Sequence, residues 1–136
     1  MQFRITYNEI QELINRKTGK SVPILYGGPH TVRISYDVNV LFKSTSVGLD
    51  ITVDRINGGD IFLSYSGGAA IEMMVRTALG RFKGQPGAEM LEVLDGNRLL
   101  LSLSKSPQAS QIFEKIELRD ICFDEQYAIL DFVPKL

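Results

Sequence analysis

The chain has 136 residues, of which 44% are hydrophobic and 23% charged, a composition typical of a globular protein with one core. Its 15 basic and 16 acidic residues leave a net charge of -1, whereas nucleic-acid-binding proteins usually carry a basic excess that neutralises phosphates. We therefore expect no nucleic-acid partner. The single cysteine, Cys122, excludes an intrachain disulfide and any site with several cysteine ligands.

The sequence carries no signal that directs it to a membrane or to secretion. No run of about 18 apolar residues occurs, and no apolar segment follows a basic start. The expectation is a cytoplasmic protein without a transmembrane segment.

The first predicted element is a short amphipathic helix over residues 7–17. Thr6 and Glu9 have the spacing of a capping box, in which each side chain bonds the backbone amide of the other residue. Gly19 is a typical helix stop. The apolar stripe between them consists of Ile10, Leu13 and Ile14.

Strands are predicted next. Residues 22–26 form either an edge strand or an extended loop, because Pro23 cannot donate a hydrogen bond within a sheet. Residues 32–40 and 47–53 alternate between apolar and polar side chains, which indicates two half-buried strands. The short polar segment 42–46 between them predicts an antiparallel hairpin.

A third strand follows the turn sequence Asn57-Gly58-Gly59-Asp60, which is typical of a tight hairpin. Ile61, Leu63 and Tyr65 share one face of this strand, so the three strands should form a meander with one packed face.

The central helix is predicted over residues 69–83, after Gly67-Gly68. It should lie across the apolar face of the meander, because its own apolar residues recur at helical spacing. These are Ile71, Met74, Val75, Ala78, Leu79 and Phe82.

The last third of the chain is predicted with alternatives left open. Residues 90–94 could be strand or helix, while residues 99–103 favour a hairpin strand. Ser106-Pro107 is a typical helix start. Two final strands are expected over residues 118–123 and 127–133.

These elements predict an α+β fold, with residues 1–136 in a single domain. The expected architecture is a largely antiparallel curved sheet, made of a meander and hairpins, with about three helices. The central helix is expected to pack on one face of that sheet.

No catalytic or metal-binding template fits the sequence. The one histidine, His30, lies in a Gly-Pro loop, and no serine occupies a nucleophile elbow. One His and one Cys leave only carboxylates as metal ligands, and no calcium-loop or phosphate-loop motif occurs. We expect no cofactor and no metal. An enzyme remains the third hypothesis, with His30, Tyr36 and Asp37 as its candidate residues.

The sequence contains more large apolar side chains than a single core needs. Several fall off the main apolar face of their element, so they could line a pocket or a subunit interface, or be covered by a second layer. These off-phase residues are Leu41, Phe62, Met73 and Leu100.

The order of elements resembles the small bacterial relatives of the tubular lipid-binding, TULIP-type domains. The likeness rests on the capped first helix at Thr6, the long alternating strands, the central helix, and a helix that leads into a final strand pair over residues 116–132. The resemblance implies a curved sheet that wraps a helix and encloses an apolar groove.

Two binding hypotheses therefore precede the enzymatic one. The first is a non-enzymatic binder of an apolar or lipid-like ligand. Its predicted lining residues are Met74, Phe82, Leu63, Ile51 and Leu101. The alternative is a homodimeric interaction module that uses an exposed strand edge or the off-phase residues Phe62 and Met73.

Overall fold

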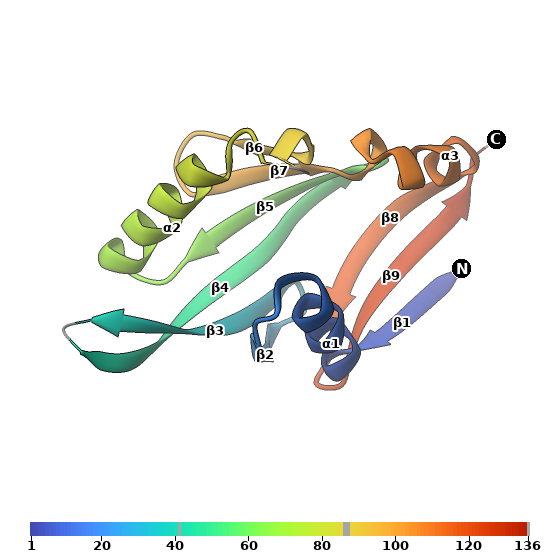
Figure 1. Cartoon of the computed structure of the whole chain (residues 1–136). Helices are drawn as coiled ribbons and strands as arrows, with labels where there is room; N and C mark the ends of the chain where they lie inside the picture. Colours follow the sequence, from blue (N-terminus) through green and yellow to red (C-terminus); the bar gives the residue numbers. More distant parts are fainter. Residues whose placement is uncertain (41, 86–87, 136) are drawn as a thin grey trace.

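The structure is a computed structural model, and it describes residues 1–40, 42–85 and 88–135 (Figure 1). The described chain forms three α-helices and nine strands in two antiparallel sheets, which confirms the α+β class. The smaller sheet has the order β1 (Gln2–Thr6), β9 (Tyr127–Pro134), β8 (Ile116–Phe123). The larger sheet has the order β2 (Ile24–Gly28), β3 (Thr31–Val40), β4 (Lys43–Asn57), β5 (Asp60–Ser66), β7 (Arg98–Ser102), β6 (Leu91–Val93).

The helices lie where the sequence predicted them. They are α1 (Tyr7–Thr18), α2 (Ala69–Phe82) and α3 (Pro107–Lys115), with the short 3-10 turns η1 (Ala88–Met90) and η2 (Leu103–Lys105). The capping box of α1 is confirmed: the Glu9 amide donates to Thr6 Oγ1 and the Thr6 amide donates to Glu9 Oε1, both at 3.1 Å. Gly19 ends α1 in the left-handed conformation, with φ of 73°.

The predicted meander is present as β3, β4 and β5, but its first hairpin is longer than expected. The β3–β4 ladder continues to the pair Val40–Lys43, so the prediction of a polar connection over residues 42–46 is wrong. The polar residues belong instead to the paired strands, as in the pairs Asn39–Ser44 and Asp37–Ser46.

A β-bulge in β4 redirects its last residues toward the core. Val53 pairs with Leu63 and Arg55 pairs with Phe62, so Asp54 has no opposite residue. The extra residue shifts the side-chain phase by one position, and Ile56 consequently packs against the core beside its partner Ile61.

The core lies at one end of the larger sheet, where β5, α3 and β8 meet. Its buried residues are Leu118, Ile61 and Phe113, with exposed fractions of 1%, 5% and 8%. Half-buried residues from β4, β5, β7 and the smaller sheet surround them, among them Val53, Leu63, Leu101, Ile121 and Leu130. The smaller sheet and α3 are thus packed at this end, whereas α2 lies at the other end, beside the β3–β4 hairpin (Figure 1).

The central helix is less buried than its sequence predicts. The expectation was a helix packed across the apolar face of the meander, yet no residue of α2 is buried. Met73 and Met74 keep 66% and 44% of their surface exposed. An apolar stripe on α2 therefore remains accessible beside the sheet.

Candidate functional site

An apolar groove of about 310 Å³ runs between α2 and the strands β3 and β4. Helix α2 forms one wall of the groove, and the strands β3 and β4 form its floor. Val22, in the segment between α1 and β2, also lines the groove. Every lining side chain is apolar: Val22, Ile34, Val47, Leu49, Ile71, Met74, Val75 and Ala78.

The floor follows from strand alternation and register. Ile34 pairs with Leu49, and Val47 lies two residues before Leu49, so the three side chains project from the same face of the sheet. The wall follows from helical spacing, because residues at i, i+3, i+4 and i+7 share one side of a helix. Ile71, Met74, Val75 and Ala78 have this spacing.

The start of α2 is fixed by a close backbone approach at Gly67. A Cβ atom there would lie 2.9 Å from the carbonyl oxygen of Gly48 and 3.1 Å from Cγ2 of Ile71. Only glycine allows the strand-to-helix connection to pass this close to β4.

Hydrogen bonds of Glu72 hold the same end of α2 in place. One oxygen of its carboxylate accepts the amides of Gly67 and Gly68 at 3.2 and 3.1 Å, and the other accepts the side-chain amide of Asn97. Arg76 donates to Asn97 Oδ1 at 2.7 Å, which ties a second turn of α2 to the β6–β7 connection. The hydrogen bond from Asn97, followed by that from the Gly67 amide, lowers the pKa of Glu72 below its ordinary value of 4.5.

The attachment of α2 should consequently depend on pH. Because the pKa of Glu72 is lowered in the folded state, its stabilising contribution is present above its ordinary pKa and is lost as the pH falls through the lowered value. We expect the melting temperature of the wild type to fall more steeply than that of Glu72→Gln as the pH is lowered below the ordinary pKa of 4.5. Thermal unfolding followed by circular dichroism measures both slopes. Equal slopes in the two proteins would contradict the role of Glu72.

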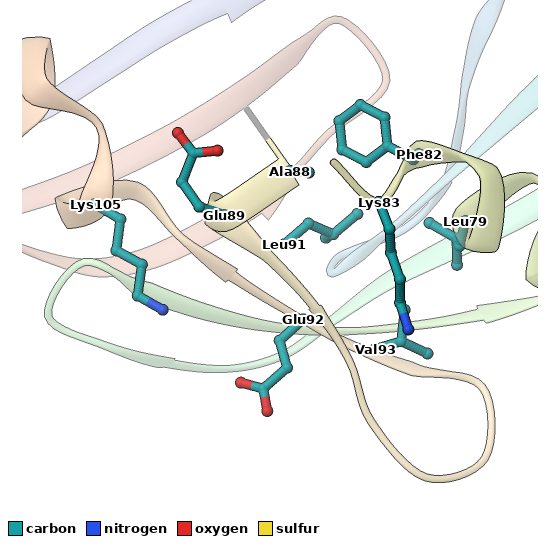
Figure 2. A pocket seen from close by; sticks show the side chains of 9 residues that line it. All are labelled: Leu79, Phe82, Lys83, Ala88, Glu89, Leu91, Glu92, Val93 and Lys105. Carbon is teal, nitrogen blue, oxygen red and sulfur yellow. The ribbon is translucent and has the colours of Figure 1, made fainter. Parts of the chain in front are cut away.

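A second pocket, of about 360 Å³, lies at the other end of α2 (Figure 2). Its apolar residues are Leu79, Phe82, Ala88, Leu91 and Val93. Two lysines and two glutamates complete the lining, and Figure 2 shows Lys83 and Lys105 entering from opposite sides. This pocket is therefore amphipathic, in contrast to the groove.

The five residues predicted to line a ligand site lie in different places. Met74 lines the groove, and Phe82 lines the second pocket. Leu63 and Leu101 pack against the core cluster at the opposite end of the sheet. Ile51 is half-buried in β4, where it pairs with Val32 of β3 and Tyr65 of β5. It lies two residues after Leu49 and is not among the residues that line the groove.

The two predicted interface residues lie on opposite sides of the sheet layer. Leu63 faces inward with Val53, so its neighbour Phe62 projects from the other face, where the Arg55 guanidinium lies 4.2 Å from the centre of its ring. Met73 projects from α2, which covers the inner face. Leu41, another off-phase residue, lies outside the described residues.

The candidate catalytic residues do not converge. His30 is exposed, with Nε2 3.7 Å from Asp120 Oδ1, and Asp37 is exposed seven residues further along β3. Seven residues of extended strand span about 23 Å, so the two side chains cannot act on one substrate atom. The side chain of Tyr36 lies outside the described part of the structure.

Cys122 is not arranged as a nucleophile. Its partial burial, followed by the carboxylates of Asp120, Asp124 and Asp131, raises the pKa of its thiol. A raised pKa disfavours the reactive thiolate. Within residues 1–40, 42–85 and 88–135, no group of three or more His, Cys, Asp or Glu side chains could hold a metal ion.

None of the helices in the described ranges is both long and apolar enough to cross a membrane. Comparison of the chain with protein-family models, with curated protein sequences and with solved structures found no match in any of the three.

Proposed function

We propose that the protein is a non-enzymatic binding domain whose groove between α2 and the strands β3 and β4 holds an apolar or lipid-like ligand. The observation that carries this proposal is the composition of the groove, whose eight lining residues are all apolar. Its volume of about 310 Å³ falls within the range of small-molecule sites. A groove without polar groups selects for a hydrocarbon portion of a ligand rather than for a charged one.

The wall of the groove suits ligands of variable shape. Met74 is unbranched and flexible, so its half-exposed side chain can adapt to the hydrocarbon chain of a bound ligand. No residue of α2 is buried, and an apolar ligand in the groove would cover part of the stripe that water now contacts. The TULIP-type resemblance of the element order implies the same class of ligand.

Filling the groove tests the proposal. Ala78 lines the groove and is exposed, so Ala78→Phe should place its ring in the groove without disturbing the core. We expect the variant to bind the uncharged fluorescent probe N-phenyl-1-naphthylamine about tenfold more weakly than the wild type. Fluorescence titration measures both affinities.

Thr77→Phe is the matched control, because Thr77 is exposed on the same turn and lies outside the groove lining. It should bind the probe as the wild type does. Native mass spectrometry of freshly purified protein, with organic extraction, would identify a bound natural ligand. A wild type without saturable probe binding, or an Ala78→Phe variant with unchanged affinity, would refute the groove as the binding site.

A further inference from the structure

The strand β2 ends the larger sheet with an uncharged, apolar edge. Its sequence is Ile24-Leu25-Tyr26-Gly27-Gly28, and its free side faces no further strand of the described chain. Leu25 and Tyr26 are 56% and 41% exposed. An exposed apolar edge of this kind is a template for pairing with another strand.

The other terminal strands carry the charges that usually prevent such pairing. Arg4 lies in β1, Glu92 in β6, and Arg119 and Asp120 in β8. In β1, the amide of Thr6 is also already bonded to Glu9. Charged side chains at an edge oppose association, and β2 differs from these strands because none of its residues is charged.

The backbone groups that β2 leaves free can be assigned from its register. The amide of Ser35 donates to the Pro23 carbonyl at 3.1 Å, and Leu25 pairs with Arg33 two positions further on. In an antiparallel pair, hydrogen-bonded positions alternate with positions whose groups point away. Pro23 and Leu25 therefore bond toward β3, whereas the amides and carbonyls of Ile24 and Tyr26 point to the open side.

We propose that β2 pairs antiparallel with β2 of a second copy of this chain, about a two-fold axis at Leu25. Ile24 of one copy then exchanges both backbone hydrogen bonds with Tyr26 of the other, and Leu25 lies opposite its own counterpart. Such a two-fold contact is self-complementary, since each strand offers the same free groups to the other. It joins the two six-stranded sheets into one continuous sheet.

The exposed area of the chain agrees with an additional interface. The accessible surface is 9300 Å², whereas a compact monomer of 15.2 kDa is expected to expose about 7,100 Å². A standard interface buries roughly 800 Å² of each partner. The chain as a whole therefore exposes more surface than a compact monomer of its mass, as expected when part of that surface is covered in an assembly.

The predicted register is tested by disulfide cross-linking. Leu25 lies on the axis in a non-hydrogen-bonded pair, where the two Cα atoms are about 4.5 Å apart, within the range that a disulfide bridges. In a Cys122→Ser background, Leu25→Cys should form a covalent dimer under mild oxidation. Tyr26→Cys is the control, because its Cα atoms would be about 8 Å apart and should not be bridged.

Removing the edge tests the dimer itself. Sedimentation at tens of micromolar should give the wild type twice the mass of 15.2 kDa. Leu25→Lys should be a folded monomer, because it places two ammonium groups opposite each other on the axis. Phe3→Lys, at a 60% exposed site on β1, should remain a dimer.

Three outcomes would overturn the proposal. These are a monomeric wild type, a Leu25→Lys variant that still dimerises, and cross-linking of Leu25→Cys that is no faster than that of Tyr26→Cys. Circular dichroism of each variant confirms that a change in mass does not reflect unfolding.

Discussion

Replacement of Leu118 by alanine should lower the free energy of unfolding by about 3 kcal/mol, because it removes three carbons from the centre of the core and leaves a cavity. Leu118 is 1% exposed and is the most completely buried large side chain of the described residues. It projects from β8 against Ile61 and Phe113, which belong to β5 and α3. The loss is therefore expected to loosen the contact between the two sheets.

Urea denaturation measures this loss, with the stability obtained by linear extrapolation. Ile112→Ala is the matched control, because it deletes the same number of carbons from α3 at a site that is 53% exposed. Its cost should be less than about 1 kcal/mol, since little area is removed from the interior. Equal losses in the two variants would mean that the core is not centred on Leu118.

Elements specified by neighbouring residues could be predicted from the sequence. Thr6 and Glu9 specify the start of α1 through contacts three residues apart. The Asn57–Asp60 pair closes the β4–β5 turn with a positive φ at Gly58, and Pro107 starts α3 at its first position. Each of these signals is local, so no knowledge of distant contacts was needed.

The division of the strands between two sheets was not predicted, because it depends on distant pairing. Residues 2–6 contain too short a pattern to indicate a strand, and β1 exists through its pairing with residues 127–131 of β9. The bulge at Asp54 is a second example. It changes which residues of β4 face inward, and nothing in the local alternation marks it.

The groove was only partly predictable for the same reason. Alternation places Ile34, Val47 and Leu49 on one face, and helical spacing places Met74 and Val75 on another. Whether the two surfaces close against each other or leave a groove depends on the position of α2. That position is set by contacts of Gly67 and Glu72 with residues of β4 and of the β6–β7 connection.

The position of α2 therefore depends on Gly67, and replacing this residue should be costly. In Gly67→Val the new Cβ would meet the Gly48 carbonyl oxygen at 2.9 Å, and backbone cannot move aside as a flexible side chain can. Overpacking of this kind costs about 2 kcal/mol, and the β-branched side chain adds further contacts with Ile71 and Leu49. Because relief of the clash displaces the first turn of α2, probe binding in the groove should fall together with stability.

Gly80→Ala, on the same helix, is expected to raise the free energy of unfolding, whereas Gly67→Val should lower it. Gly80 lies inside α2, its φ is not positive, and a Cβ there would meet nothing within 4 Å. Alanine should consequently raise the free energy of unfolding by roughly 0.5–1 kcal/mol, because it restricts the unfolded chain more than glycine does. Urea denaturation of both variants measures whether each free energy of unfolding rises or falls relative to the wild type. If Gly67→Val were as stable as the wild type, the close approach at Gly48 could not be what positions α2, and the wall of the groove would have to be held by the Glu72 contacts alone.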